Sequence, residues 1–575
     1  MQWKSRGFKS IPEIINENTG GNADRMLMGS NSCDYNIANL PEMAAAINYI
    51  VEQNMPIYII GDYDVDGIHA TAELFLLLRE LGAVNIHIRL PRRMSEGYGL
   101  SPKIVDEIPD GHGAVITVDN GITAVEAIKK AKAKGLIVLV IDHHMPLIGK
   151  AGKEEIPEAD LIVDPAVDDI LIAKKYSKSD FRKYCGAGLV YKIAERMVPG
   201  TSLLGTLSVF AAIATIADVV PLVEDNRNIY RMGIENIFNG NITPGLAALI
   251  RQLQSGGKVN ESDIGFKIAP MINAPGRIYD DGAQIALEAV LAGTDSQAYV
   301  LTEELKDINE KRKILKEEAV KRAMDYIKDN CLFAENPIVI FDPETPEGIV
   351  GLVAGAIQEE FNVTAIALTE SGGYMKGSAR AAEGDNIKEA LDAFNRAYPG
   401  VILKYGGHPK AAGLTLKKES FDIFSDGMRN IMPPVKERED ILFYDMEIEA
   451  GQISRIVSQV RQYAPFGEGN PEPVFLIKNF KLVPQENTFF KEMGKDSIRF
   501  RGAGCEAVGF SLAQKYQDEK CPKEMDIVGK LSYHHFMGKT CPQIEMMDFK
   551  SAKGETVKLG INIDIMNQLK KFNLG

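Results

Sequence analysis

The chain has 575 residues, of which 45% are hydrophobic and 25% charged, and its formal net charge is −14 at pH 7. This composition is typical of a soluble globular protein with three or four domains, and the longest apolar run is far below the ~18 residues of a membrane span. The acidic balance argues against a protein that coats nucleic acid, because phosphate binding depends on Lys and Arg, but it is compatible with a local basic groove.

The N-terminal residues include no apolar stretch of the kind found in secretory signals. The six cysteines show no Cys-x-x-Cys pair and no zinc-ligand spacing. We therefore expect a cytoplasmic protein with reduced thiols. Residues 1–45 are polar, with Asn and Gly clustered at 16–22, and we expect a loose lead-in to a helix at 40–53.

The most informative stretch follows, where the apolar run 57–60 leads into Gly-Asp-Tyr-Asp-Val-Asp-Gly. We interpret it as a buried strand that delivers Asp62, Asp64 and Asp66 to one place. In an extended segment, residues two apart point to the same side, so the three carboxylates would repel one another unless a cation lay between them. The stretch predicts a divalent metal site built from oxygen ligands.

A calcium-binding EF-hand loop begins with the same Asp-x-Asp-x-Asp-Gly pattern, and its twelfth residue is a Glu, here Glu73. An EF-hand loop also needs a helix on each side. The residues before Asp62 read as a strand, and only residues 70–81 read as a helix, so the pattern favours a site at a strand end.

Two further apolar runs end in the same way. The run 113–118 ends at Asp119, and the run 136–141 ends at Asp142-His143-His144, with an amphipathic helix predicted between them at 123–134. Strands that alternate with helices predict a doubly wound parallel sheet, whose ligand sites lie outside the carboxyl ends of the strands. We therefore expect all three acidic clusters to converge on one edge.

A fourth apolar run, 207–217, leads into Asp218, which is either a solvent-facing carboxylate at a helix end or a further ligand. Residues 240–295 look helical around a loop that holds 273–277, and a long charged helix is predicted at 297–329. A polar helix of this length usually bridges two lobes, with a cleft between them.

The second lobe is expected to begin with a strand at 337–341 and a glycine-rich turn at 348–355 that enters a helix. Such entries present backbone N–H groups to anions. From about residue 436, short strands with turn signals indicate a small β-barrel.

Taken together, the motifs resemble those of the DHH phosphoesterase superfamily. They are GDYDVDG at 61–67, VDNGI at 118–122, DHH at 142–144, ADVVPL at 217–222, INAPGR at 272–277, GSAR at 377–380, GGH at 406–408 with AAG at 411–413, and PFGEGNP at 465–471. Within the superfamily the chain is most similar to the RecJ-type family of single-strand-specific 5′-to-3′ DNA exonucleases, from about residue 45 to about residue 550.

This resemblance implies an α/β fold: a parallel-sheet DHH domain, joined by a long helix to a second α/β (DHH-associated) domain, and a C-terminal OB-fold β-barrel. The expected parts are a lead-in at 1–45, the DHH catalytic domain at 46–240, a helical region with the connecting helix at 241–330, the DHH-associated domain at 331–435, the OB-fold nucleic-acid-binding domain at 436–555 and a tail at 556–575.

The ligand types favour two divalent ions, Mn²⁺ or Mg²⁺, because oxygen-rich ligation with one imidazole suits these ions better than a structural zinc. By family position Asp119 is the bridging ligand, and Asp64 and Asp66 divide between the ions. The full expected set of metal ligands is Asp62, Asp64, Asp66, Asp119, His143 and Asp218. His143 and Asp218 would complete one site. Asp62 would either bind an ion directly or contact a residue or water that does.

The expected catalytic residues are Asp119, His143 and His144. His144 is expected to face the phosphate and either donate to its oxygen or protonate the leaving oxygen. The resemblance implies a further set that contacts the substrate: Arg93, Arg277, Ser378, Arg380, Gly407 and His408. In the barrel, Lys495, Arg499, Arg501 and His535 are candidate contacts.

One departure from the family pattern precedes the Gly-Ile-Val-Gly turn. Related sequences often carry Trp-His there, whereas this chain has Thr345-Pro346-Glu347. Whatever that His contributes in relatives is absent here, which could alter substrate handling or rate without removing the metal site.

The implied function is a metal-dependent exonuclease of DNA repair and recombination that releases 5′-mononucleotides from single-stranded DNA. A helicase and a single-strand-binding protein are the partners suggested, with a monomer and no membrane association. Two alternatives stay open. One is a DHH phosphodiesterase of short oligonucleotides or cyclic dinucleotides, whose members generally lack the barrel. The other is a non-catalytic replication scaffold of the Cdc-like branch, whose members have lost metal ligands.

Overall fold

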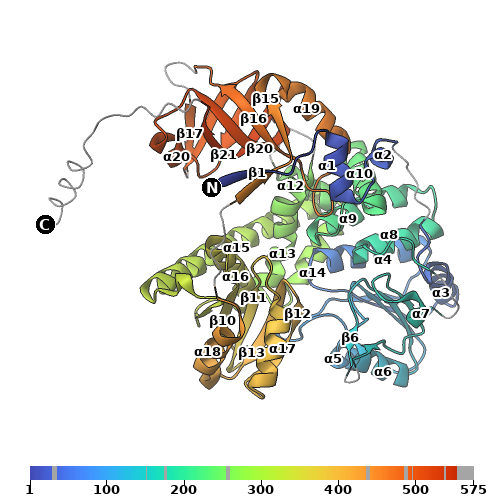
Figure 1. Cartoon of the computed structure of the whole chain (residues 1–575). Helices are drawn as coiled ribbons and strands as arrows, with labels where there is room; N and C mark the ends of the chain where they lie inside the picture. The colour runs from blue at the N-terminus through green and yellow to red at the C-terminus, as the bar shows by residue number, and fades with distance from the viewer. Residues whose placement is uncertain are drawn as a thin grey trace. The chain divides into compact units, whose positions relative to one another are not determined.

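The computed structural model describes residues 1–28, 35–149, 152–173, 178–253, 259–434, 441–484, 490–494, 496–536 and 539–552. Lys495 and the tail at 556–575 lie outside these residues, as does the side chain of His535. The chain forms two compact units (Figure 1). One combines Met1–Met28 and Glu439–Ala464 with the chain from Glu472 onward, and the other combines Gly29–Arg438 with Pro465–Pro471. No described helix is long and apolar enough to cross a membrane.

The larger unit begins with a parallel sheet in the order β3-β2-β4-β5-β8. Its strands are β2 (Ile57–Ile60), β3 (Ile86–Arg89), β4 (Ala114–Val118), β5 (Ile137–Ile141) and β8 (Leu161–Val163), all parallel to their neighbours. The chain leaves β2 for one neighbour, β3, and returns to the other, β4. The strand order therefore reverses at β2, which is where α/β sheets open a ligand site.

Helices cover both faces of this sheet because alternate strand residues point to opposite sides. Ile57, Ile59 and Ile116 pack with α3 (Leu40–Glu52), α4 (Val65–Glu80) and α8 (Gly186–Met197). On the other face, Val115 and Val138 pack with α5 (Pro102–Glu107) and α6 (Val125–Ala133). The predicted parallel α/β domain is confirmed.

Helices follow the sheet as far as residue 329. They are α9 (Ser202–Ala217), α10 (Glu224–Asn239), α11 (Pro244–Arg251), the short α12 (Glu261–Asp263), the π-helix η1 (Ile264–Ile268), α13 (Ala269–Ile278), α14 (Gly282–Val290) and the 35-residue α15 (Asp295–Asp329). The expected loop at 273–277 is wrong, since these residues lie inside α13 despite Pro275. Ile272 and Ala274 are fully buried, and this packing outweighs the hydrogen bond that proline removes.

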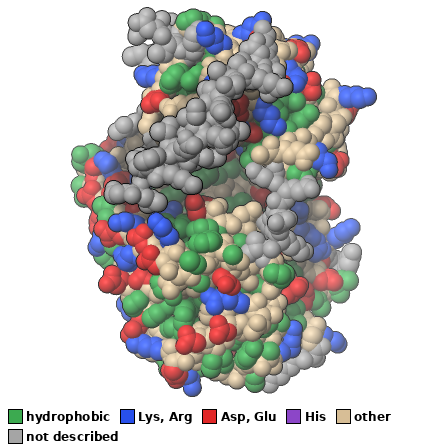
Figure 2. All heavy atoms as spheres, turned by 60° about the vertical axis from the view of Figure 1, so that its left-hand side comes forward, with side chains coloured by type: hydrophobic (Ala, Val, Ile, Leu, Met, Phe, Trp, Pro, Cys, Tyr) green, Lys and Arg blue, Asp and Glu red, His purple; other side chains and the backbone are tan. Residues whose placement is uncertain are grey.

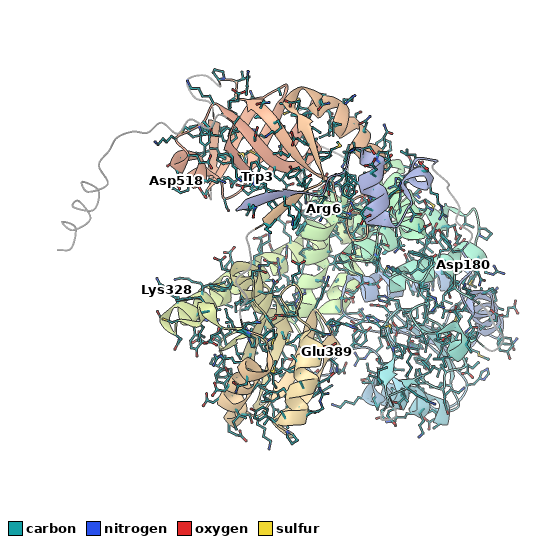
Figure 3. The ribbon with its side chains drawn as sticks, in the orientation of Figure 1. Trp3, Arg6, Asp180, Lys328, Glu389 and Asp518 are labelled. Carbon is teal, nitrogen blue, oxygen red and sulfur yellow. The ribbon has the colours of Figure 1, made fainter. Side chains whose placement is uncertain are left out.

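The second sheet of this unit has the order β12-β13-β11-β10-β9. Its strands are β9 (Ile338–Phe341), β10 (Ala365–Ser371), β11 (Tyr374–Arg380), β12 (Ile402–His408) and β13 (Ala411–Leu416), with helices α16 (Val350–Phe361), α17 (Ile387–Ala397) and α18 (Phe421–Ile431). Figure 3 labels Lys328 near the end of α15 and Glu389 on α17. A second α/β lobe after a long helix is confirmed.

The other unit is built on a seven-stranded sheet in the order β15-β16-β20-β21-β19-β18-β17. Its strands are β15 (Met446–Glu449), β16 (Val474–Lys481), β17 (Phe490–Gly494), β18 (Ser497–Gly502), β19 (Cys505–Gly509), β20 (Glu524–Phe536) and β21 (Lys539–Ser551). The predicted C-terminal β-rich domain is therefore present.

The N-terminal residues differ from the expected loose lead-in. β1 (Gln2–Ser5) pairs in parallel with β14 (Ile441–Tyr444), and α1 (Ile11–Thr19) and α2 (Ala23–Met28) follow in the same unit. Trp3, labelled in Figure 3, donates from its indole Nε1 to Asp548 Oδ2 at 2.7 Å. The polar composition of this segment hid the strand, because its partner lies more than 400 residues further along the chain.

Candidate metal centre and phosphate-binding residues

The first acidic motif differs in local structure from the extended segment expected. β2 ends at Ile60, and α4 begins at Val65, with Asp64 as its N-cap accepting from Gly67 N–H at 3.1 Å. Asp66 therefore lies in the first turn of a helix, where the exposed N–H groups and the helix dipole favour a carboxylate. The two oxygens of Asp66 accept from Gly186 N–H and Ala187 N–H at 2.6 and 2.8 Å, at the start of α8.

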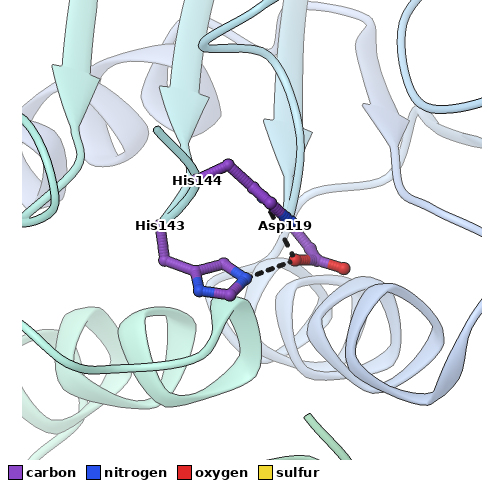
Figure 4. A group of neighbouring side chains, drawn as sticks. All are labelled: Asp119, His143 and His144. Carbon is purple, nitrogen blue, oxygen red and sulfur yellow. Dashed lines mark hydrogen bonds and ion pairs between the residues drawn. The ribbon is translucent and has the colours of Figure 1, made fainter. Parts of the chain in front are cut away.

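Asp119 follows β4 in a left-handed conformation, with φ of 60°. This conformation is uncommon for a residue with a side chain and occurs at sites where the surrounding structure enforces it. Here Asp119 N–H donates to Ile141 O at 2.9 Å, and Tyr98 Oη donates to Asp119 O at 2.5 Å. His143, two residues after β5, brings its Nε2 to 3.0 Å from Asp119 Oδ1 (Figure 4).

The structure brings the predicted metal ligands into overlapping groups at this edge of the sheet. Their ligand atoms lie within 4.8 Å of one another in three groups: Asp62, Asp64 and Asp119; Asp66, His143 and Asp218; and Asp119, His143 and His144. His143 Nε2 lies 3.6 Å from Asp66 Oδ2 and 3.8 Å from Asp218 Oδ2, where Asp218 caps the C-terminus of α9. Asp119 thus lies between two clusters. Their assignment as metal ligands stays a prediction.

The electrostatics of the clusters fit bound cations. Burial, and then the neighbouring carboxylates, raise the pKa of Asp62, Asp119 and Asp218 well above the usual value. Asp62 is 1% exposed, and its Oδ2 has no hydrogen-bond partner among the described residues, although Oδ1 accepts from Gly99 N–H at 3.2 Å. A buried carboxylate oxygen without a donor is costly, and a hard cation is a partner that satisfies it.

His144 has a different environment from His143. His144 Nδ1 lies 2.7 Å from Asp142 Oδ1, and Tyr98 Oη lies 3.0 Å from the same nitrogen. Burial alone would lower the pKa of His144, but Asp142 raises it to about 9. For His143, burial and the nearby His144 lower the pKa. His144 is therefore the imidazole suited to carry a proton, and Asp142 holds its orientation.

Tyr98 was not predicted as a site residue. In the sequence, residues 97–100 read as a Gly-Tyr-Gly-Leu turn beside the active edge of the sheet, but nothing local linked Tyr98 to His144, 46 residues away. The glycines of that turn were the available sequence signal, because glycine is favoured where the backbone is left-handed or closely packed. In the structure, Gly99 has φ of 59°, and a Cβ there would meet Asn120 at 2.7 Å.

Phosphate-binding candidates of the second lobe gather at the end of β11. Ser378 and Arg380 share a face of the strand, and Arg380 Nη1 donates to Ser378 Oγ at 2.8 Å. A Cβ on Gly351, in the first turn of α16, would lie 3.1 Å from Arg380 Nη2 and 3.2 Å from Ser378 Oγ. A helix N-terminus, a hydroxyl and a guanidinium thus lie together, which is a typical set of anion donors.

Arg277 and Arg93 lie near this set. Arg277, on α13, donates from Nη1 to Gly348 O at 3.3 Å, and Arg93 stacks over the Tyr63 ring at 4.5 Å. Burial, and then Arg93, lower the pKa of Arg277 to about 9. Lys376 Nζ on β11 donates to Met94 O at 3.1 Å, so the two lobes of this unit are in contact beside Arg93.

His408, at the end of β12, lies near enough to His144 for their charges to interact. Burial, and then the charge of His144, lower the pKa of His408. Gly407 has φ of 141°, and a Cβ there would meet Ala411 O at 2.3 Å, so a larger residue would disrupt the turn that holds His408.

Other predicted residues lie away from these groups. Glu73, the twelfth residue of the alternative EF-hand loop, is fully buried inside α4 and belongs to none of the ligand groups of the described residues, which argues against an EF-hand. In the other unit, Arg499 and Arg501 both pair with Glu506, at 3.6 and 3.0 Å.

The segment 345–347, which stands where related sequences often carry Trp-His, makes hydrogen bonds within this chain. Thr345 Oγ1 donates to Asp342 Oδ2 at 2.6 Å, and Glu347 accepts from Lys376 Nζ at 2.8 Å.

Outside the site, Lys and Arg side chains are interspersed with Asp and Glu over the face drawn in Figure 2.

The chain matches three family models: the DHH family N-terminal domain at residues 56–216, the DHHA1 domain at 334–432 and the RecJ OB domain at 444–548. The single-stranded-DNA-specific exonuclease RecJ of Salmonella typhimurium is 30% identical, over 86% of this chain and 87% of that protein. The chain belongs to the RecJ family. The Escherichia coli RecJ is 29% identical, over 94% of each chain.

Solved RecJ structures resemble the fold. The RecJ of Thermus thermophilus in complex with Mn²⁺ matches with a TM-score of 0.77 and 26% identity, over 96% of this chain and 80% of that one. An exonuclease RecJ bound to manganese matches with a TM-score of 0.58 and 29% identity, over 69% of this chain and 96% of that one. The OB domain expected for the β-rich unit is thus supported by both sequence and fold.

Proposed function

We propose that this RecJ-family chain is a metal-dependent exonuclease that hydrolyses single-stranded DNA in the 5′-to-3′ direction and releases 5′-mononucleotides. One observation carries the proposal: the carboxylate and imidazole clusters around Asp119 lie on the same unit as the phosphate donors Arg277, Ser378 and Arg380. His408 and His144 are near enough for their charges to interact, which links the two sets.

The residues fit two divalent ions, Mn²⁺ or Mg²⁺. Asp66, His143 and Asp218 would hold one ion, and Asp62 and Asp64 the other, with Asp119 shared. When bound, such a pair activates water and offsets the charge that develops on the phosphate. Relatives with structures in complex with Mn²⁺ support this choice of ion.

The remaining steps belong to the side chains. Arg277, Ser378 and Arg380 would hold phosphate oxygens and orient the scissile diester for attack by water. Attack forms a P–O bond from water and breaks the bond to the 3′ oxygen of the terminal nucleotide. His144, protonated beside Asp142, would donate its Nε2 proton to that leaving oxygen. The products are a 5′-mononucleotide and a strand shortened by one nucleotide.

Digestion of oligonucleotides labelled at the 5′ or the 3′ end tests the proposal. Single strands with a 5′ label should release labelled mononucleotide at once, while a 3′ label should stay on progressively shorter strands, and duplexes should resist. Release from the 3′ label first would overturn the polarity. Rapid cleavage of two- to five-nucleotide substrates or cyclic dinucleotides, with long strands untouched, would instead support the small-substrate phosphodiesterase.

We also propose that the chain acts as a monomer in DNA repair, alongside a helicase and a single-strand-binding protein. The net charge of −14 supports a need for such partners, because a polyanion is poorly retained by an acidic protein. Stimulation of duplex digestion by a purified helicase would test this.

A further inference from the structure

A fourth guanidinium group joins Arg93, Arg277 and Arg380. It belongs to Arg312 on α15, and its charge is one of those that lower the pKa of Arg277. Within the described residues, no ion pair joins any of the four to a carboxylate. Four guanidinium groups thus gather without a direct carboxylate partner in a protein with a net charge of −14, and the carboxylates that influence them, Asp64 and Glu310, act only at longer range.

Arg312 is set apart from the cations beside it on the helix. Lys313 Nζ pairs with Glu310 at 2.6 Å, and Lys311 Nζ lies 5.1 Å from the centre of the Tyr279 ring. Arg312 is only partly exposed, and its buried Nε has no hydrogen-bond partner among the described residues. A buried N–H of a charged group without an acceptor is costly, so the position calls for an anion or another acceptor.

The packing of α13 against α15 places Arg312 next to Arg277. Asn273 and Arg277 are four residues apart on α13, and Asn309 and Arg312 are three apart on α15, so each pair shares a helix face. The Oδ1 atoms of both asparagines are also buried without a partner in the described residues. These oxygens are acceptors, so the groups on the two helices that can donate to an anion are the guanidinium groups of Arg277 and Arg312.

We propose that Arg312 is a further substrate-binding residue, which contacts a phosphate of the single strand alongside Arg277. This inference rests on the proposed function and adds to it a residue from the connecting helix. A guanidinium fork with a buried Nε matches the geometry of a phosphate, which accepts from two N–H groups at once. Binding of the strand would supply the missing acceptor and offset the repulsion among the four guanidinium groups.

The test compares the binding of a single-stranded oligonucleotide at several salt concentrations, in an Asp119→Ala background that does not digest it. Arg312→Gln should weaken binding about 10-fold, and it should reduce the slope of log affinity against log salt by about 0.7, the value of one phosphate contact on a single strand. Arg312→Lys, which keeps the charge, should retain most of the slope. Lys313→Gln, on the same helix but paired with Glu310, is the matched control and should leave both unchanged.

The outcomes separate the two levels of inference. If Arg312→Gln lowers the thermal stability but leaves the salt slope equal to that of the control, Arg312 only packs the helices and the inference is overturned. The inference is also overturned if Lys313→Gln reduces the salt slope as much as Arg312→Gln does. If the wild-type protein neither binds nor digests single strands, the proposed function falls, and the inference about Arg312 falls with it.

Discussion

At the scale of single residues, the centre is a set of buried carboxylates that repel one another unless cations lie between them. Asp62, Asp119 and Asp218 all have a raised pKa, first because they are buried and then because of neighbouring carboxylates. The folded metal-free protein therefore binds protons more tightly than the unfolded chain does.

The first prediction concerns stability in the absence of metal. Because the pKa of these carboxyl groups is raised on folding, stability is highest below the unfolded value of ~4 and falls as the pH rises toward the folded values. In EDTA, the melting temperature should fall between pH 5 and pH 8, and Mn²⁺ should restore it at pH 8. Thermal melts at both pH values check this.

The variant Asp119→Asn serves as the control for this prediction. It removes one buried charge, so it should raise the metal-free stability at pH 8 by ~1 kcal/mol and abolish most of the shift on adding Mn²⁺. An Asn variant that is less stable without metal and gains as much from Mn²⁺ as the wild type would contradict the account.

A second prediction concerns Tyr98, whose hydroxyl donates to Asp119 O and lies 3.0 Å from His144 Nδ1. Tyr98→Phe keeps the ring but loses the hydroxyl, so it should lower kcat about 10-fold, the equivalent of one hydrogen bond of ~1.4 kcal/mol, with little change in KM. Steady-state kinetics on a single-stranded oligonucleotide provide the measurement. A kcat equal to that of the wild type would show that the hydroxyl orients neither group.

At the scale of elements, the start of α8 fits closely against the end of β4. A Cβ on Gly186 would lie 2.6 Å from Asp119 Cβ and 2.9 Å from its Cα, and Gly186 N–H also donates to Asp66. The helix N-terminus can therefore donate to Asp66 and still pack against Asp119 only if its first residue is glycine.

The third prediction follows from this contact. Gly186→Ala should displace Asp119 and lower kcat about 100-fold, even though alanine favours helix formation. Gly355 on α16 is the matched control, since a Cβ there meets nothing within 4 Å. Gly355→Ala should keep full activity and add up to ~1 kcal/mol of stability. Equal effects of the two substitutions on kcat would argue against the close-contact explanation.

Sequence reasoning succeeded where the signal was local. Apolar runs that end in Asp62, Asp119 or Asp142 marked strand ends, and the parallel topology then brought them to one edge. It failed at the start of α4, where Asp66 lies in the first turn of a helix and not in an extended segment. The donors that Asp66 meets, at the start of α8, lie about 120 residues away and gave no local signal. Arg312 gave no signal, since one Arg on a charged helix reads as a surface residue.

At the scale of the whole molecule, the chain crosses between two compact units, and its N-terminus belongs with its C-terminal sheet. Trp3 is the only tryptophan of the chain, and it lies in the β-rich unit, where Lys550 Nζ sits 4.2 Å from the centre of its ring. Intrinsic tryptophan fluorescence therefore reports on that unit alone.

The fourth prediction uses this probe. Because the candidate metal ligands all belong to the other unit, Mn²⁺ should raise the thermal transition seen by circular dichroism but leave the Trp3 fluorescence transition nearly unchanged. Asp119→Asn should abolish the rise of the circular-dichroism transition with Mn²⁺ and leave the Trp3 fluorescence transition unchanged. An equal shift of both transitions with Mn²⁺ would mean that the units unfold as one.

The central claim is that the carboxylates and imidazoles around Asp119 form a metal centre that digests single-stranded DNA. The most direct test is mononucleotide release from a single-stranded oligonucleotide by metal-depleted protein, before and after addition of Mn²⁺, with Asp119→Ala in parallel. The account predicts no release without metal, rapid release with Mn²⁺, and a loss of at least about 1,000-fold in the variant. Release by Asp119→Ala at the wild-type rate would contradict it.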